Sequence, residues 1–294
     1  MNIHSIETFG THEGPGIRFV IFTQGCNYKC LYCHNPDSQQ LERQVNSLES
    51  KVTSHGNYSI EELIAMIENN RPYFGEKGGV TVSGGEPLLQ AKEVGQLFKR
   101  LKNTAPYSPP NLGGETISSP PNLGGVRGGI NTALDTNGSI LNDDVKELLK
   151  YTDLVLLDIK HIDPIEHQKI TNPELRTPNS QLQTADIARD GSSRVPSILF
   201  ADYLDSQDIP FWIRYVFVPG YTDQSEFLVK TAEALKKYKS LERIEILPYH
   251  TMGADKYEKL GWDYKLTGVE PPTAKGLASA KQIFEKSGKL VIIR

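Results

Sequence analysis

The segment Gly25–His34 reads GCNYKCLYCH and contains all three cysteines of this 294-residue chain. The cysteines are spaced Cys26-x3-Cys30-x2-Cys33, and Gly25 allows a tight backbone turn before the first of them. A closed zinc or iron–sulfur site normally takes four protein ligands. Three thiolates on one short loop therefore indicate a metal cluster that keeps one position open for a ligand other than protein.

Two plainer interpretations of the cysteines stay open. The first is a structural zinc ion held by the three cysteines and His34, although adjacent residues such as Cys33 and His34 rarely both reach one tetrahedral ion. The second is a set of three unconnected thiols. An odd number of cysteines, all within eight residues, does not fit a disulfide framework, so the thiols are expected to be reduced.

Composition and charge argue against several classes of partner. The formal net charge of −4 gives no reason to expect binding to nucleic acid or to an anionic membrane. The chain has no run of about 18 apolar residues and no charged-then-apolar signal segment at its start. We therefore expect a cytoplasmic protein, and we expect it to be a monomer.

Apolar, β-branched runs alternate with helical patterns along the chain. Strands are expected at residues 17–23, 80–83, 131–134, 154–159, 212–218, 243–247 and 289–293, and helices at 59–70, 91–103, 142–151, 225–239 and 273–287. Ser59 and Glu62 form a capping-box pair at the first helix. Repeated strand–helix order predicts an α/β fold with a parallel sheet, and six main units favour a partial (β/α)6 barrel of the TIM type.

Polar residues support the barrel because they follow, or lie on, one strand after another. Active sites of (β/α) barrels form at the C-terminal ends of the strands. We therefore expect one site at that rim. Its candidate residues are the three cysteines, Gly84-Gly85-Glu86, Asp135-Thr136-Asn137-Gly138, Asp158 with Lys160, Arg214 and His250.

Each of these segments also has a structural interpretation. Gly84-Gly85-Glu86 fits a plain turn, but beside the cysteine loop it would let a ligand approach bare backbone, where Glu86 suits an ammonium group. Asp135 and Thr136 at a strand end offer oxygen ligands or hydroxyl-binding groups, although the following Asn-Gly pair is a turn signal.

The later candidates are individually less specific. Asp158 and Lys160 share one strand face, as they would on a surface strand. Arg214 lies inside an apolar strand and should face a carboxylate, since a buried unpaired charge costs several kcal/mol. A lone histidine is more often structural, but His250 follows the last strand of the predicted rim.

Two stretches interrupt the pattern. Residues 104–129 are rich in Pro, Gly and Ser and repeat PPNLGG at 109–114 and 120–125. This composition cannot support a core, so we expect a passive, mobile insertion on the face opposite the site. Residues 177–195 are polar and also look inserted; they follow the Asp158 strand and could approach the rim.

Together these residues resemble the radical S-adenosylmethionine (SAM) enzymes, whose hallmark is the Cys-x3-Cys-x2-Cys loop with an aromatic residue, here Tyr32, before the last cysteine. Within them the chain is most similar to the pyruvate formate-lyase activating enzymes, whose motifs appear in the same order. Those motifs are GPGIR at 14–18, CHN at 33–35, SGGE at 83–86, LDTNG at 134–138, DIK at 158–160, WIRYV at 212–216, LPYH at 247–250, YKL at 264–266 and PP at 271–272. The resemblance spans nearly the whole chain except the two insertions and implies a single radical SAM domain over residues 1–294.

The resemblance implies one 4Fe-4S cluster on Cys26, Cys30 and Cys33, with its fourth iron chelated by the amino and carboxylate groups of SAM. The implied SAM-binding residues are the Tyr32 backbone and His250 near the adenine, Gly84, Gly85 and Glu86 at the amino group, and Lys160 and Arg214 as polar partners. Asp135, Thr136 and Asp158 would hold a monovalent cation beside the SAM carboxylate, which places both aspartates in the cofactor site. Oxygen ligands suit such a hard cation.

The resemblance also implies the reaction. A reduced cluster passes one electron to SAM, and the resulting 5′-deoxyadenosyl radical removes a hydrogen atom from a backbone glycine of pyruvate formate-lyase, a step that belongs to anaerobic glucose metabolism. The cofactors carry this chemistry, so no acid, base or nucleophile is required of the protein. The electron is expected from flavodoxin or ferredoxin.

The surface that receives the glycine loop is implied at Glu13, Gly14, Pro15, Gly16 and Arg18. The family has a valine–aspartate pair before Gly-Pro-Gly, whereas this chain has His12-Glu13, which keeps the charge on a longer side chain.

Alternative functions are activation of a different glycyl-radical enzyme, another small radical SAM reaction, or a non-catalytic iron–sulfur electron carrier. A carrier would want four protein ligands and would not need the Gly-Gly-Glu segment.

Overall fold

The computed structural model describes residues 1–40, 56–105, 129–172 and 194–294. Its strands are β1 (Asn2–Gly10), β2 (Arg18–Thr23), β3 (Gly56–Asn57), β4 (Gly79–Gly84), β5 (Asn131–Thr136), β6 (Leu154–Asp158), β7 (Phe211–Phe217), β8 (Leu241–Pro248) and β9 (Leu290–Ile293). Its α-helices are α1 (Ile60–Asn70), α2 (Ala91–Lys102), α3 (Asp143–Leu149), α4 (Pro164–Thr171), α5 (Pro196–Ser206), α6 (Ser225–Leu235), α7 (Ala254–Lys259) and α8 (Ala274–Glu285). Short 3-10 helices lie at Pro36–Ser38, Arg71–Tyr73 and Pro87–Gln90.

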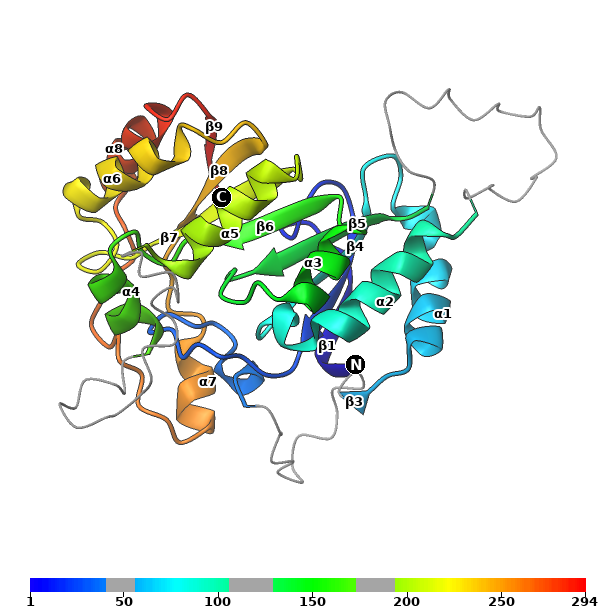
Figure 1. Cartoon of the computed structure of the whole chain (residues 1–294). Helices are drawn as coiled ribbons and strands as arrows, with labels where there is room; N and C mark the ends of the chain where they lie inside the picture. Colours follow the sequence, from blue (N-terminus) through cyan, green and yellow to red (C-terminus); the bar gives the residue numbers. More distant parts are fainter. Residues whose placement is uncertain (41–55, 106–128, 173–193) are drawn as a thin grey trace, which may run out of the picture.

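The strands form one sheet in the order β3-β1-β2-β4-β5-β6-β7-β8-β9. Neighbouring strands from β2 to β9 pair in parallel, whereas β1 is antiparallel to β2 and to β3. Because β3 and β9 remain as edges, the sheet is an open, partial barrel, with helices packed along its outer face (Figure 1). The predicted α/β fold is confirmed.

The two faces of the sheet differ because side chains alternate along each strand. The main core lies between the sheet and the helices and includes Leu134, Val155, Leu157, Ile213 and Ile244. The opposite, inner face has a small apolar cluster of Ala133, Leu154, Leu156 and Trp212. The alternation places Asp135, Asp158, Arg214 and Glu245 on that same inner face, nearer the C-terminal ends of the strands.

Local signals account for several element boundaries. The Ser59 hydroxyl accepts a hydrogen bond from the Glu62 backbone, and the Glu62 carboxylate accepts one from the Ser59 backbone, so the predicted capping box is confirmed.

The sequence patterns did not predict β1, α4, α5 or α7. The expected insertions at 104–129 and 177–195 lie mostly outside the described residues, because the structure does not describe 106–128 or 173–193. Among the described segments, no helix combines the length and the hydropathy that a membrane crossing requires.

Candidate active site

A cavity of about 420 Å³ opens at the C-terminal ends of the parallel strands. We call it the central cavity, and its size is typical of small-molecule sites. It brings together most of the residues that the sequence predicted. These are Glu13, Cys26, Cys30, Tyr32, Cys33, Gly84, Gly85, Glu86, Asp135, Thr136, Asp158, Lys160, Arg214 and His250.

The cysteine loop is held from both ends by backbone hydrogen bonds. Gly25 has a φ of 99°, as its predicted turn requires, and its N–H donates to Ser38 at 2.7 Å. Further along, the N–H groups of Lys29 and Leu31 donate to Thr171 and Ile170 at the end of α4, at 2.7 and 2.9 Å. The loop that presents the thiols is therefore fixed by main-chain contacts.

The thiols suit a bound metal cluster. Burial raises the pKa of all three, that of Cys30 to about 12, and neighbouring cysteines raise the pKa of Cys26 and Cys30 further. Ligating thiols must be deprotonated, so the positive charge of bound iron would offset the cost of burying the thiolates. The described residues contain no group of three His, Cys, Asp or Glu side chains arranged for a single metal ion.

His34 and His250 stack on each other beside the cysteines. Their ring centroids lie 3.9 Å apart with an interplanar angle of 23°. Burial lowers the pKa of His34 to about 4, and His250 lowers it further. His34 Nε2 and His250 Nδ1 are buried without a hydrogen-bond partner among the described residues, so each ring nitrogen is available to a ligand at the cavity wall. His34 thus packs on His250, which does not favour the zinc interpretation.

Gly84 and Gly85 allow β4 to approach the cysteine loop. A Cβ on Gly85 would lie 2.1 Å from the carbonyl oxygen of Gly25, and one on Gly84 would lie 2.2 Å from the backbone nitrogen of Thr23. Gly84 also has a φ of 113°. The sequence analysis interpreted these two glycines as a place where a ligand can approach the backbone. The structure shows in addition that the neighbouring backbone of Thr23 and Gly25 leaves no room for a side chain at either position.

The Glu86 carboxylate, which the sequence suggested as a partner for an ammonium group, is held by donors of the chain itself. The side chain is 0% exposed, and its oxygens accept hydrogen bonds from Thr136 Oγ1 at 2.5 Å, Asn137 N at 2.8 Å and Leu88 N at 3.0 Å. Burial raises its pKa to about 7, although these hydrogen bonds oppose the rise. In this geometry the carboxylate braces the loops behind the cavity wall.

Arg214 faces a carboxylate, as predicted. Its NH1 donates to Asp135 Oδ2 at 2.8 Å, and Ser83 Oγ donates to the same oxygen at 2.8 Å. Burial raises the pKa of Asp135, and the positive charge of Arg214 opposes that rise. Burial would lower the pKa of Arg214, but Asp135, Asp158 and Glu245 raise it overall.

Asp158 and Lys160 form an ion pair within the cavity. Lys160 Nζ donates to Asp158 Oδ2 at 2.6 Å and lies 5.7 Å from the ring centroid of Tyr32. Burial alone would lower the pKa of Lys160, but Asp158 and nearby Tyr32 raise it well above its usual value. The lysine is therefore a permanent positive charge beside the cysteine loop.

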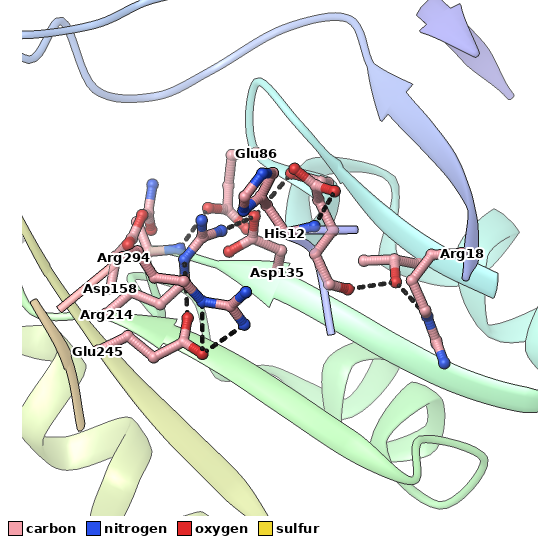
Figure 2. A network of polar contacts seen from close by, with 12 residues as sticks. His12, Arg18, Glu86, Asp135, Asp158, Arg214, Glu245 and Arg294 are labelled. Carbon is pink, nitrogen blue, oxygen red and sulfur yellow. Dashed lines mark hydrogen bonds and ion pairs between the residues drawn. The ribbon is translucent and has the colours of Figure 1, made fainter. Parts of the chain in front are cut away.

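Sequence reasoning missed Glu245 and Arg294. The Glu245 side chain is 0% exposed, and its Oε1 contacts NH2 of Arg243 and NH2 of Arg294, each at 2.8 Å. Figure 2 shows this carboxylate meeting Arg214 and Arg294 next to Asp135. The available signal was a charged residue between two isoleucines in β8, which resembles the signal that identified Arg214.

The predicted partner surface needs one correction. Arg18 is 0% exposed, so it cannot contact a partner directly. Its guanidinium donates to Thr81 Oγ1 at 2.9 Å and to Asn131 Oδ1 at 2.7 Å, apart from the Glu245 cluster (Figure 2). Burial lowers its pKa to about 9. Because Thr81 Oγ1 in turn donates to the Glu13 carbonyl at 2.6 Å, Arg18 supports the 12–16 loop from below.

The comparisons with known proteins identify the family of this chain. A family model described as the radical SAM superfamily matches residues 20–232. The chain therefore belongs to the radical SAM superfamily, whose enzymes work with a 4Fe-4S cluster and SAM.

Similar proteins refine the family. A protein of Staphylococcus epidermidis named pyruvate formate-lyase-activating enzyme is 37% identical over 298 residues, covering 99% of this chain and 98% of that protein. A protein of the same name from Staphylococcus aureus is 35% identical with the same coverage.

Solved structures support the fold alone, because their identity to this chain is low. SuiB of Streptococcus suis, bound to the precursor peptide SuiA, has a TM-score of 0.55 at 13% identity, covering 98% of this chain and 50% of that chain. A radical SAM methyltransferase from Sphaerobacter thermophilus has a TM-score of 0.53 at 14% identity, covering 94% and 66%.

Proposed function

We propose that this chain activates pyruvate formate-lyase by making a glycyl radical on it. The central observation is that the three cysteines and the predicted polar residues line one cavity in a chain 37% identical to a named activating enzyme. When bound, the 4Fe-4S cluster and SAM supply reductive cleavage to a 5′-deoxyadenosyl radical that removes a hydrogen atom from a backbone glycine. The protein binds, orients and shields these groups.

In this proposal Cys26, Cys30 and Cys33 hold the cluster, and the backbone at Gly84 and Gly85 receives the SAM amino group. The Tyr32 backbone and His250 lie at the adenine. Lys160 and Arg214 supply positive charge near the SAM carboxylate. Glu86 acts on SAM through Thr136 and Asn137, which its carboxylate holds.

We also propose a monovalent cation at Asp135, Thr136 and Asp158. Supporting it, all three residues line the cavity, where they offer two carboxylates and a hydroxyl oxygen. A hard cation takes oxygen ligands of this kind. The Thr136 hydroxyl donates a hydrogen bond to Glu86 and accepts one from the Gly138 backbone at 3.1 Å, which leaves its oxygen one further lone pair.

The protein substrate is proposed to contact the loop from His12 to Gly16. His12 and Glu13 line the central cavity, so a peptide at this loop would reach the reacting groups. Gly16 has a φ of 71°, and a Cβ there would lie 2.5 Å from Gly78 N, which supports a loop of fixed shape. Arg18 contributes only through Thr81.

The electron donor is proposed to be flavodoxin or ferredoxin, acting in the cytoplasm. A second cavity, of about 360 Å³, is lined by Lys29, Cys30, Leu31, Gln39, Tyr257, Trp262, Asp263 and Lys265. Cys30 borders both cavities, so this one offers a route to the cluster that SAM would not block. We expect Trp262→Ala to slow SAM cleavage driven by the protein donor and to leave cleavage driven by dithionite unchanged.

The test of the proposed function is an electron paramagnetic resonance measurement. Reconstituted protein, SAM and a reductant are mixed anaerobically with pyruvate formate-lyase. A glycyl-radical doublet that appears together with pyruvate formate-lyase activity supports the proposal. SAM cleavage without a radical on this partner would instead favour a different glycyl-radical enzyme as substrate.

A further inference from the structure

The carboxylate of Glu245 has no assigned role in the function proposed above, although it lies directly behind Arg214. It belongs to the inner face of β8, where its register partner on β7 is Arg214. Its Oε1 is shared by Arg243 and Arg294, and its Oε2 lies 3.9 Å from Arg214 Nε. A wholly buried carboxylate thus has three guanidinium groups around it.

Arg214 lies between two carboxylates. Its NH1 donates to Asp135 at 2.8 Å, while its Nε is turned toward Glu245. Among the described residues, neither Arg214 Nε nor Glu245 Oε2 has a hydrogen-bond partner, so each is the nearest complement of the other. Asp135 holds one end of the guanidinium, and the attraction of Glu245 holds the opposite side.

The charges of this cluster are nearly balanced. Three guanidinium groups, of Arg214, Arg243 and Arg294, face the two carboxylates of Asp135 and Glu245. Without the Glu245 charge, the three cations would repel one another more strongly, although Asp135 and Asp158 still act on Arg214 and Glu242 still acts on Arg243. Arg214 and Arg294 both border the central cavity, and Arg214 is the one whose guanidinium also donates to Asp135.

We propose that Glu245 is a positioning residue that holds Arg214 against Asp135 and thereby sets the affinity of the central cavity for SAM. The inference rests on the proposed function, because it takes SAM as the ligand. In the proposed function Arg214 supplies positive charge near the SAM carboxylate, so a guanidinium that leaves its place against Asp135 would no longer meet that carboxylate. Asp135, left without its partner, would also lose its fixed orientation.

The test measures the dissociation constant of SAM on reconstituted protein with an oxidised cluster, by equilibrium dialysis and without turnover. Glu245→Gln should weaken SAM binding about 10-fold to 100-fold, the usual effect of removing a partner of a binding residue. Glu242→Gln is the matched control, because it removes a carboxylate from the same strand that accepts from Trp212 Nε1 instead. We expect the control to change the constant by less than about twofold.

Two further variants separate positioning from net charge. In an Arg214→Met background, Glu245→Gln should cause no further loss, since Glu245 acts through Arg214. Glu245→Gln combined with Arg294→Gln removes one charge of each sign and should still bind SAM weakly. If circular dichroism shows that Glu245→Gln alone does not fold, the double variant is measured in its place.

The outcomes are distinct. An unchanged dissociation constant in Glu245→Gln, additive losses in the Arg214→Met background, or full recovery in the double variant would each overturn the inference. Wild-type protein that carries a cluster but does not bind SAM would instead contradict the proposed function.

Discussion

The hydroxyl of Thr136 donates a 2.5 Å hydrogen bond to the buried carboxylate of Glu86. The same carboxylate accepts from the backbone of Asn137, and the Glu86 N–H donates to Gly25 at 2.8 Å. One residue thereby joins the ends of β4 and β5 to the cysteine loop. The geometry of the cavity depends on this junction at least as much as on the groups that face a ligand.

Removing this carboxylate should loosen the junction. Glu86→Ala leaves three donors unsatisfied, on Leu88, Thr136 and Asn137, and should lower the free energy of unfolding by about 3 kcal/mol. Glu86→Gln keeps one acceptor oxygen and should cost less. Urea unfolding of both variants and the wild type measures the difference. Equal stability of Glu86→Ala and wild type would show that the carboxylate does not brace these loops.

Gly85→Ala should disrupt the cysteine loop. The added Cβ would lie 2.1 Å from the Gly25 carbonyl, which is backbone and cannot rotate away. We expect loss of at least about 2 kcal/mol of stability and a lower iron content after reconstitution. Gly276→Ala in α8 is the control, since its Cβ would have only an ordinary contact of 3.4 Å with Thr273. Normal iron content in Gly85→Ala would contradict the close approach of β4 to the loop.

His167 should make stability depend on pH. Burial lowers its pKa from 6.5 to about 4, and its Nε2 lies 3.3 Å from the Tyr28 hydroxyl. The unfolded state takes up a proton first as the pH falls, so stability that is present above pH 6.5 is lost between 6.5 and 4. Between pH 7 and 5 this amounts to about 2 kcal/mol.

The comparison with His167→Gln isolates that contribution. Between pH 7 and pH 5, the free energy of unfolding should fall by about 2 kcal/mol more in the wild type than in His167→Gln. His12→Gln removes an exposed histidine and should behave like the wild type. Identical losses in wild type and His167→Gln would mean that His167 is not a buried neutral group.

Deleting residues 106–128 should leave SAM cleavage intact. The two ends of this stretch meet in the structure, because Ile130 N donates to Leu101 O at 3.1 Å, and Thr104 N donates to that same oxygen at 3.3 Å. A short glycine–serine linker can therefore join Ala105 to Gly129. The rate of 5′-deoxyadenosine formation in the deletion protein, checked for folding by circular dichroism, tests this. A large loss in a folded protein would mean that the stretch takes part in the reaction.

The sequence was most informative where a residue type has few alternatives. Three cysteines on one loop predicted a shared site, and the structure places all three at one cavity. Arg214 inside an apolar strand required a carboxylate, which Asp135 provides. Arg18 was assigned to the partner surface because the resemblance implied it there. Strand alternation turns its side chain to the inner face instead, where Thr81 and Asn131 receive it.

Other features depend on contacts between distant segments. β1 was missed because its burial alternates irregularly, and it is placed by pairing with β2 and β3. The role of Glu86 depends on Thr136 and Asn137, which lie about 50 residues away along the chain. Neither relationship can be obtained from a local pattern. The partner loop and the cation site remain predictions that await experiment.

The most direct test of the account is reductive SAM cleavage. Protein reconstituted anaerobically with iron and sulfide is reduced in the presence of SAM, and 5′-deoxyadenosine is measured by chromatography, with Cys30→Ala as the control. The account predicts 5′-deoxyadenosine from the wild type and none from Cys30→Ala. Cleavage that persists in Cys30→Ala, or no product from wild type that carries a cluster of about four irons, would contradict it.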